Sequence, residues 1–256
     1  MPYEYEYRYA FGSYNRDHII KILKELGGIK HGHWLFRVQV FIHPLEKTHT
    51  YIRVRDEGHK ITMTFKEKEE NEFVRENEVI INDFTEGCKI LLGMGCKKKY
   101  YYEKMREIWH IKNTEICFDT NPGRPDIMEV ESETEDELNK MVKLLGLENV
   151  QHDNFTEMSL YTNPFGIVIP KTVDLTFETA KEILGPVCTK NKKIFNQLID
   201  AQNKLLIKVK ETNETNEINI LNKQNKTKLK RISKKIYKNP SKNLSKKISK
   251  FKKHIN

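Results

Sequence analysis

The sequence lacks the long apolar run that a membrane helix needs, and it contains few cysteines. No stretch approaches the roughly 20 apolar residues that span a bilayer. The chain begins with alternating charged and aromatic residues rather than with an apolar signal. We therefore expect a soluble, intracellular protein of the cytoplasm or, for a viral gene, of the host cytoplasm or the virion. The 4 cysteines are widely spaced without a CxxC pair, which predicts buried, reduced thiols rather than disulfides or zinc ligands.

Several catalytic signatures are missing as well. Gly93-Met94-Gly95 is not followed by Gly-Lys-Ser/Thr, which excludes a phosphate loop and predicts the end of a helix. No Ser-His-Asp or Cys-His spacing is recognisable. His31 and His33 have no cysteine nearby, which favours a partly exposed structural pair over a metal site. The run 100–102 is three tyrosines beside three lysines. It could stack on bases, but we expect it to pack on the outside of the fold.

Acidic residues are absent from the C-terminal part of the chain. The net charge is +9, yet no Asp or Glu follows Glu217, whereas 14 of the 45 Lys and Arg lie between Lys223 and Lys253. Residues 1–217 therefore carry 31 basic residues (45 minus 14) against 36 acidic ones, a net charge of −5. This asymmetry predicts one domain over 1–207 with a C-terminal helical extension, and a flexible linker with a basic tail over 208–256.

Alternation of polar and apolar residues predicts mostly antiparallel strands, interrupted by helices. Asp56-Glu57-Gly58 is a hairpin signal between two of the strands. Ser132-x-x-Glu135 has the spacing of a capping box, which predicts that a helix begins there. The expected strands cover 4–9, 33–43, 49–56, 60–66, 73–81, 100–111, 114–119, 127–131 and 158–161. The expected helices cover 15–26, 85–94, 135–145 and 194–206.

Charged side chains share one face of most of these strands, because successive side chains of a strand point to opposite faces. An ordinary sheet would turn this face to water. The charges, however, come in like pairs at alternate positions, and acidic and basic pairs lie on different strands. Like charges repel unless opposite charge lies between them. A sheet curled inward would place carboxylates, which bind Mg²⁺ or Mn²⁺, opposite Arg and Lys, which bind phosphate.

The same segments resemble the motifs of the CYTH superfamily, the triphosphate tunnel metalloenzymes. Glu4-x-Glu6-x-Arg8 is similar to the ExExK signature of that family, with arginine in place of its lysine. The remaining motifs follow in the family's order over roughly residues 2–165. They are Tyr51-Ile52-Arg53-Val54-Arg55, Thr64-Phe65-Lys66, Arg75-Glu76-Asn77-Glu78, Lys104-Met105-Arg106, Asp119 and Met128-Glu129-Val130-Glu131.

The resemblance implies an α+β fold with a closed or nearly closed antiparallel β-barrel of about eight strands around a polar tunnel. It implies Mg²⁺ or Mn²⁺ as cofactor. The implied metal ligands are Glu4, Glu6, Asp119, Glu129 and Glu131. The implied substrate-binding residues are Arg8, Arg53, Arg55, Lys66, Lys104 and Arg106. The implied catalytic residues are Arg8, Lys66, Glu76 and Glu78.

The resemblance leaves the reaction open. The favoured hypothesis is a metal-dependent phosphohydrolase acting on inorganic triphosphate, thiamine triphosphate, a nucleoside triphosphate or an RNA 5′ end. The alternative is a class IV-type adenylyl cyclase, which would convert ATP to cyclic AMP and pyrophosphate. A third hypothesis is a non-catalytic module that binds polyphosphate or a nucleic-acid end. In that case the tail over 223–253 would contact phosphate backbones; the other reading of the tail is a solvated extension.

Overall fold

The computed structural model describes residues 5–45, 50–68, 74–152, 164–168 and 173–213. Glu4, the strand expected over 158–161 and the basic tail over 223–253 lie outside the described residues. The chain divides into two units, Met1–Lys210 and Glu211–Asn256. Of the second unit, only 211–213 are described, and they are helical. The predicted boundary after residue 207 stays a prediction.

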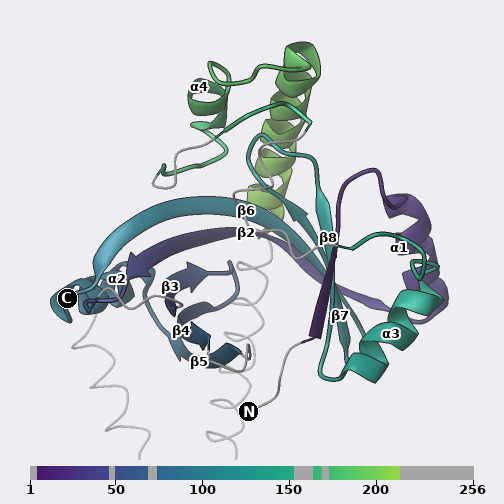
Figure 1. Cartoon of the computed structure of the whole chain (residues 1–256), viewed down its shortest axis with the longest axis horizontal. Helices are drawn as coiled ribbons and strands as arrows, with labels where there is room; N and C mark the ends of the chain where they lie inside the picture. The colour runs from purple at the N-terminus through teal and green to yellow at the C-terminus, as the bar shows by residue number, and fades with distance from the viewer. Residues whose placement is uncertain (1–4, 46–49, 69–73, 153–163, 169–172, 214–256) are drawn as a thin grey trace, which may run out of the picture. The chain divides into compact units, whose positions relative to one another are not determined.

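Eight antiparallel strands form one sheet, which confirms the predicted fold class (Figure 1). Their order across the sheet is β1-β8-β7-β6-β2-β3-β4-β5. The strands are β1 (Tyr5–Tyr9), β2 (Ile29–Ile42), β3 (Thr50–Asp56), β4 (Ile61–Lys68), β5 (Val74–Ile81), β6 (Lys97–Ile111), β7 (Thr114–Thr120) and β8 (Ile127–Ser132).

The sheet curls strongly, and β2 and β6 carry the curvature. These two strands are 14 and 15 residues long, and they pair along almost their whole length. Their ladder has irregularities between Lys30 and Gly32 and between Val40 and Phe41, and such bulges bend a sheet. Within the described strands β1 pairs only with β8, and β5 only with β4. The sheet is therefore a half-barrel, and no ladder between β1 and β5 closes it there.

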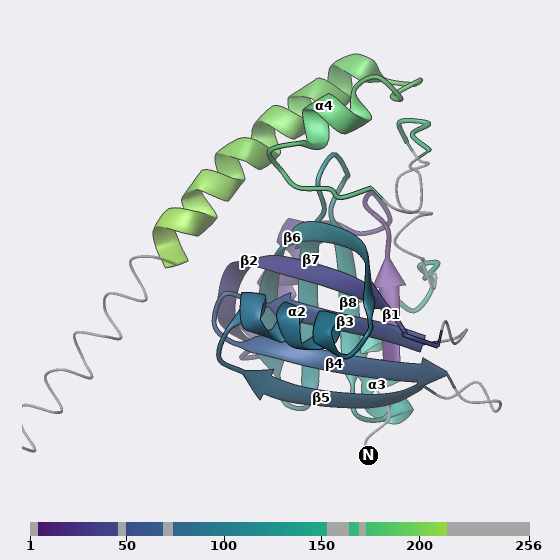
Figure 2. The ribbon, with the colours of Figure 1, turned by 90° about the vertical axis from the view of Figure 1, so that its left-hand side faces the viewer.

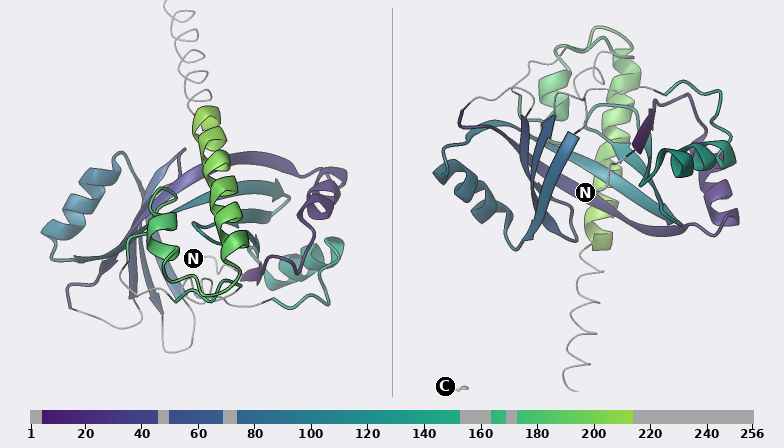
Figure 3. Two further views of the ribbon diagram at one scale, coloured as in Figure 1. Left: turned by 90° about the horizontal axis from the view of Figure 1, so that it is seen from above. Right: turned by 60° about the horizontal axis from the view of Figure 1, so that its bottom comes forward.

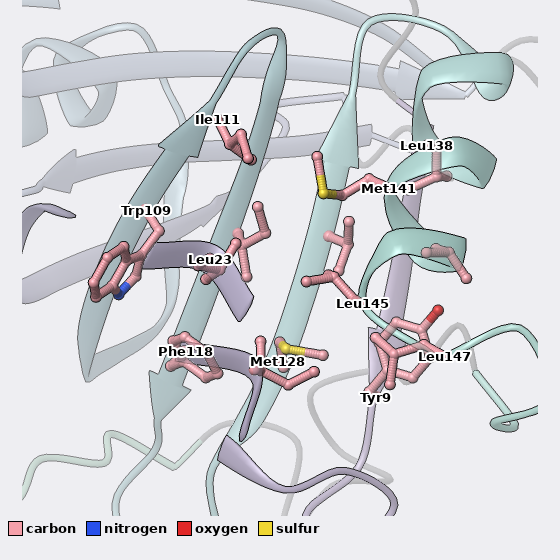
Figure 4. Packing of buried hydrophobic residues seen from close by; sticks show 14 residues of the cluster. Tyr9, Leu23, Trp109, Ile111, Phe118, Met128, Leu138, Met141, Leu145 and Leu147 are labelled. Atoms are coloured by element: carbon pink, nitrogen blue, oxygen red, sulfur yellow. The ribbon is translucent and has the colours of Figure 1, made fainter. Parts of the chain in front are cut away.

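The apolar face of the sheet points outward and is covered by helices. The helices α1 (Arg16–Glu25) and α3 (Glu135–Leu144) pack on the β6–β8 side of the sheet (Figures 1 and 4). Side chains from both helices share one buried cluster with the outer faces of these strands. Its central members are Tyr9, Leu23, Trp109, Phe118, Met128, Leu138, Met141 and Leu145. Because this apolar surface is buried on the outside, the opposite face of each strand is left for charge.

Both of these helices begin with a side-chain cap. The Asn15 side chain accepts a hydrogen bond from the His18 amide, and Thr134 does the same for Glu137. Thr134 Oγ1 also donates to the Glu137 carboxylate. The capping box expected at Ser132 is therefore wrong by two residues. Ser132 is instead the last residue of β8, and its hydroxyl pairs with that of Thr114 on β7.

The helix α2 (Phe84–Gly93) covers the outer face of β3 and β4 (Figure 2). Its N-cap is Asp83, and Gly95, at φ +90°, follows its end as predicted. A second cluster beneath it contains Phe41, Ile52, Val54, Cys88, Leu91 and Cys96. The four cysteines are free and buried, as expected.

Two further helical segments lie after the last strand of the sheet. The short helix α4 (Ala180–Leu184) was not expected, whereas residues 192–213 form a helix that is longer than the predicted 194–206 (Figure 3). Leu175 pairs with β6, since its amide donates to Tyr101 and its carbonyl accepts from Glu103. Phe177, Leu206 and Val209 pack on Met105, whose side chain lies on the outer face of β6. No helix among the described residues has the length and apolar character to cross a membrane.

Candidate active site

A cavity of about 510 Å³ lies against the inner face of the curled sheet. Every predicted site residue that the structure describes lines this cavity. They are Glu6, Arg8, Arg53, Arg55, Lys66, Glu76, Glu78, Lys104, Arg106, Asp119, Glu129 and Glu131. Glu4 is not among the described residues. The structure thus brings the charged motifs together in one place, while the role of each residue stays a prediction.

Strand register explains why these side chains meet. Residues that face each other in neighbouring antiparallel strands point to the same side of the sheet. Glu6 of β1 faces Glu131 of β8, and Arg8 faces Glu129. On the other half of the sheet, Arg53 of β3 faces Thr64 of β4, which in turn faces a glutamate of β5. Alternation along each strand, together with the register between strands, therefore explains why these charged side chains line the same face of the sheet.

Carboxylates dominate the wall made by β1 and β8. Arg8 Nε lies 2.7 Å from Glu6 Oε1 and 3.1 Å from Glu129 Oε1. Burial, and next the neighbouring Glu129 carboxylate, raise the pKa of Glu6 above its ordinary value in spite of Arg8. The carboxylate form of Glu6 is therefore disfavoured in this structure, and an additional cation beside it would stabilise the charged form.

The centre of the cavity is a buried ion-pair network. Asp119 Oδ2 accepts from Lys104 Nζ at 2.7 Å, and both its oxygens accept from Arg106 at 2.6 Å. Arg106 also donates to Glu129. Burial opposes the charged form of Asp119, but Arg106 and Lys104 outweigh it and hold its pKa well below the usual range. In this structure Asp119 therefore orients two bases, and its predicted role as a metal ligand stays a prediction.

The basic wall comes from β3 and β4 and is balanced by β5. Lys66 Nζ lies 2.5 Å from Glu76 Oε2, and Arg53 lies 3.8 Å from the same carboxylate group. Glu78 lies 3.6 Å from Arg55 and accepts from the Thr64 hydroxyl at 2.8 Å. Burial works against ionised Glu78, but this hydrogen bond and the nearby cations lower its pKa. These glutamates hold the bases in position.

A phenyl ring, Phe36, lies under three of the cations. Its centroid is 5.8 Å from Arg55 Cζ, 5.7 Å from Lys104 Nζ and 5.8 Å from Arg106 Cζ. Such distances permit cation–π attraction. Phe36 is almost fully buried, and it faces Lys104 in the β2–β6 ladder. The sequence contained a signal for it, since a residue opposite Lys104 must share the face of Lys104.

Several other cavity residues were missed by the sequence interpretation. Tyr102 lines the cavity, so the expectation that 100–102 packs outside is wrong for it. Alternation along β6 puts Tyr102 on the face of Lys104 and Arg106. His31 is exposed and His33 is half-buried, as expected, but their surroundings differ. The β2–β6 ladder is irregular between Lys30 and Gly32; His31 lines the cavity, while His33 Nδ1 lies 3.8 Å from a Glu107 oxygen.

The remaining missed residues come from turns and strand ends. Glu57, His59 and Lys60 belong to the turn between β3 and β4, and Glu57 lies 2.6 Å from Arg55. The others are His110 and Asn121, together with the apolar Ile108 and Ile127. Glu115 also lines the cavity, as its alternation with Asp119 along the strand predicts. Turn residues follow no alternation, so only the three-dimensional path of the chain shows that they reach the cavity.

The donor chemistry of the acidic wall fits a hard divalent cation. Glu6, Glu129 and Glu131 offer carboxylate oxygens, the ligands that Mg²⁺ and Mn²⁺ prefer. Among the described residues, no group of three His, Cys, Asp or Glu side chains is already arranged so that it could hold a metal ion. Arg8 instead bridges Glu6 and Glu129. Binding of a metal to these carboxylates would therefore require Arg8 to move.

The arrangement can bind a polyanion and polarise it. Arg and Lys side chains reach the cavity from β3, β4 and β6, and acids that could hold a cation face them from β1 and β8. A chain of phosphates with a divalent cation is the ligand type that neutralises both walls. The carboxylates of β5 are already close to the bases, so they could accept protons or orient water.

Comparison with known proteins supports this fold. Residues 3–153 match the CYTH domain family model. The structure of a proposed adenylate cyclase from Vibrio parahaemolyticus is similar, with 14% identity and a TM-score of 0.54 over 63% of this chain and 98% of that chain. PH1012 from Pyrococcus horikoshii has 20% identity and a TM-score of 0.51 over 61% and 98%. A Pyrococcus furiosus protein has 20% identity and a TM-score of 0.50 over 61% and 99%. No match was found among curated proteins.

Proposed function

Because the chain belongs to the CYTH domain family, we propose that it is a metal-dependent phosphohydrolase for a triphosphate-bearing substrate. One observation carries the proposal. Basic side chains of β3, β4 and β6 and carboxylates of β1 and β8 line the same cavity of about 510 Å³. Besides this arrangement and the divalent cation, hydrolysis needs only a water molecule, whereas cyclisation also needs a site for a nucleoside.

The bases bind the phosphate chain. Arg53, Arg55 and Arg106 each present a planar guanidinium that can bind phosphate oxygens in a bidentate manner, and Lys66 and Lys104 add point charges. Side chains of Arg53, Arg55 and Arg106 are only 13%, 15% and 10% exposed. Charge interactions with a substrate there are screened by water much less than at the surface. Arg8 joins these residues from β1.

The carboxylates divide into two groups. Glu6, Glu129 and Glu131 would hold Mg²⁺ or Mn²⁺, together with Glu4. When bound, such a cation withdraws negative charge from the phosphoryl group. Arg8, which bridges Glu6 and Glu129, would contact the substrate from the same wall.

Attack by water would take place beside β5. The Glu76 and Glu78 carboxylates lie against Lys66, Arg53 and Arg55. When phosphate oxygens bind these Lys and Arg side chains, they replace the glutamates as their ion-pair partners. The glutamates can then orient water and accept its proton. As the water oxygen bonds to the terminal phosphorus, the bond from this phosphorus to the bridging oxygen breaks and the rest of the substrate leaves. The bases stabilise the negative charge that develops on these phosphate oxygens.

A substrate panel tests the proposal. The protein is incubated with inorganic triphosphate, thiamine triphosphate, ATP and 5′-triphosphorylated RNA, each with Mg²⁺ or Mn²⁺, and orthophosphate is measured. The Arg55→Ala and Lys104→Ala variants should lose at least about 100-fold in kcat/KM, as expected when a charged contact is removed from a site of this kind. The His18→Ala variant, altered on the exposed face of α1, should remain active. Absence of orthophosphate from every substrate contradicts the proposal.

The same panel separates hydrolysis from cyclisation. The family resemblance implies class IV adenylyl cyclase activity as the alternative, in which a ribose hydroxyl rather than water attacks. If ATP yields cyclic AMP and pyrophosphate and no substrate yields orthophosphate, the protein is a cyclase rather than a hydrolase. Tight binding of triphosphates with no product at all would indicate the non-catalytic module.

The basic tail is the proposed contact for nucleic acid. Fourteen Lys and Arg between 223 and 253 without an acidic residue would bind phosphate backbones in a salt-dependent manner. Deletion of residues 222–256 should leave turnover of inorganic triphosphate unchanged and abolish RNA binding at moderate salt. Equal RNA binding by the full and the shortened chain would show that the tail is a solvated extension.

A further inference from the structure

Four rings gather beside the basic residues of the cavity, and the proposed phosphate chemistry makes no use of them. We refer to His31, Trp34, His59 and His110 as the ring cluster. The His31 ring centroid lies 5.1 Å from that of His110, 5.7 Å from that of His59 and 5.3 Å from that of Trp34. The Trp34 and His59 centroids lie 4.5 Å apart. The three imidazoles line the cavity.

The imidazoles come from two strand ends and a turn that line the cavity, and the His31 and His110 rings stack on each other. His31 lies near the beginning of β2, His110 near the end of β6, and His59 in the turn between β3 and β4. His31 and His110 are exposed, and the His59 side chain is 31% exposed. Trp34 lies deeper and packs with Phe36 and its neighbours. The cluster is therefore a group of imidazoles that pack on one another and on a half-buried indole.

Two glycines make room for the indole. A Cβ added to Gly32 would lie 2.0 Å from Trp34 Cη2, and one added to Gly58 would lie 2.9 Å from Trp34 Cδ1. Gly58 has φ +80°, which also favours glycine there. Any side chain at Gly32 would displace the indole, so the backbone on both sides of Trp34 is shaped around a flat ring.

Hydrogen bonds through ring nitrogens orient two of the imidazoles. His110 Nε2 lies 2.7 Å from Glu115 Oε2, and His59 Nδ1 lies 3.2 Å from the Glu57 carbonyl oxygen. Burial lowers the pKa of His59 in spite of the Glu57 carboxylate nearby. A neutral imidazole attracts phosphate weakly, so the ring face is what His59 offers a ligand. Among the described residues no metal site of three such ligands is present.

The ring cluster is directly connected to the bases that would hold phosphate. Glu57 Oε1 lies 2.6 Å from Arg55, and Glu57 Oε2 lies 3.6 Å from Lys60 Nζ and 4.0 Å from His59 Nε2. One carboxylate thus joins Arg55 to His59. A phosphate chain bound at Arg55 would bring the group attached to it within reach of the rings.

We propose that the ring cluster binds the nucleobase of a nucleoside 5′-triphosphate, either free or at the 5′ end of RNA. The proposal rests on the proposed function, because it takes the triphosphate to lie on Arg55 and its neighbours. Every base has flat faces that stack on aromatic rings, and each stacked base contributes roughly 10- to 100-fold to affinity. Inorganic triphosphate has no group to fill this part of the cavity.

Paired substitutions test the proposal. His59→Ala and His31→Ala remove a ring, whereas His59→Phe keeps a ring without its nitrogens, and His18→Ala is the matched control on an exposed helix face. KM is measured for ATP, for a 5′-triphosphorylated RNA and for inorganic triphosphate, and Kd for ATP is measured by calorimetry. The alanine variants should raise KM and Kd for ATP about tenfold or more, while KM for inorganic triphosphate stays constant. His59→Phe should restore most of the ATP affinity.

The two sources of the base are distinguished in the same experiment. A larger effect on the RNA than on ATP identifies the 5′-terminal nucleotide of RNA, and the reverse identifies the free nucleotide. An equal rise of KM for inorganic triphosphate, or a His59→Phe variant as weak as His59→Ala, would overturn the proposal. So would stoichiometric Zn²⁺ binding that His59→Phe abolishes without any change in ATP affinity.

Failure of the proposed function gives a different result. If no substrate is hydrolysed but the Kd for ATP follows the ring pattern, the phosphohydrolase proposal fails and the base site stands. If every triphosphate is hydrolysed with kinetics that ignore His31 and His59, the base site fails and the phosphohydrolase stands.

Discussion

Arg106 and Asp119 form a bidentate ion pair in the middle of the cavity, with 2.6 Å between Nε and Oδ1 and 2.6 Å between a terminal nitrogen and Oδ2. They face each other across β6 and β7. Lys104 contacts the same carboxylate. Asp119 is only 1% exposed. Asp119 thus compensates two cations, of which Arg106 also contacts Glu129, and removal of one charge from such a buried network leaves the others uncompensated.

Replacement of Asp119 by Asn should therefore destabilise the protein strongly. Asp119→Asn keeps the size of the side chain but removes the charge that compensates Arg106 and Lys104. We expect the free energy of unfolding to fall by about 3–5 kcal/mol, as when one partner of a buried pair is removed. Urea denaturation measures the change. Glu25→Gln breaks the exposed Lys21–Glu25 pair and should change stability by less than about 1 kcal/mol. Equal effects of the two substitutions would show that the central pair is not stabilising.

His33, which lies on the outer face of the sheet, should make the free energy of unfolding depend on pH. Burial lowers its pKa to about 4, and this outweighs the Glu107 carboxylate, while Lys30 and Arg16 nearby also oppose its charge. The folded state therefore disfavours protonated His33. The contribution of neutral His33 to the free energy of unfolding is fully present above the unfolded pKa of about 6.5. It is lost as pH falls towards 4. We expect a loss of about 2 kcal/mol between pH 7 and 4.5.

Urea denaturation at both pH values, with a His33→Gln variant, isolates this contribution. The variant should lack about 2 kcal/mol of the pH dependence. Asp119 does not interfere, because its pKa is depressed in the folded state. Its contribution is therefore present above the unfolded pKa of about 3.9 and is lost only at lower pH. A variant with the same pH profile as the wild type would show that His33 is not the responsible group.

Much of the cavity could be predicted from the sequence because strands impose a strict period. Once Arg53 and Arg55 lie on one face of β3, alternation alone assigns their direction, and the apolar Ile52 and Val54 must point to the other side. The helices expected at 15–26, 85–94 and 135–145 also agree with α1, α2 and α3 within a few residues, because each begins at a capping side chain and ends at glycine.

The remaining features depend on contacts between distant residues. Glu57 and His59 reach the cavity only because the turn after β3 lies beside β2, where Gly58 packs on Trp34. A helix was predicted over 194–206, but its contact with the loop after β7 is made by Gln202, whose partners in the distant loop cannot be predicted from local sequence. The family resemblance implied closure of the barrel, which depends on how the β1 and β5 edges pair rather than on any motif.

The acidic wall leads to a prediction about divalent cations. Glu131 lies on the same face as Glu6, directly opposite it in the β1–β8 ladder, whereas Glu133 is exposed just beyond the end of β8. Glu131→Gln removes one anionic ligand and should weaken Mn²⁺ binding about tenfold or more, while Glu133→Gln should leave it unchanged. Electron paramagnetic resonance of free Mn²⁺ measures binding without any turnover. Equal Mn²⁺ affinity of the two variants would exclude Glu131 as a ligand.

Gln202 should position the loop that follows Asp119. Its amide nitrogen donates to the carbonyls of Asn121 at 3.0 Å and Arg124 at 2.7 Å, and its oxygen accepts from the Gly123 amide at 2.8 Å. Gln202 is buried, and Asn121 lines the cavity. Gln202→Leu would leave three backbone groups without these partners, each costing about 1–3 kcal/mol when it stays buried.

We therefore expect Gln202→Leu to lower the free energy of unfolding by about 3 kcal/mol and to raise KM for the triphosphate substrate, because Asn121 loses its support. Lys204→Ala, on the exposed side of the same helix, is the matched control and should change neither value. Gln202→Glu keeps the acceptor for Gly123 but places a carboxylate against two carbonyl oxygens, so it should be at least as harmful as leucine. If Gln202 positions Asn121, loss of its support must alter the cavity wall on which the substrate lies, and KM must change. A Gln202→Leu variant with lower stability and unchanged KM would therefore show that Gln202 stabilises the fold without positioning Asn121.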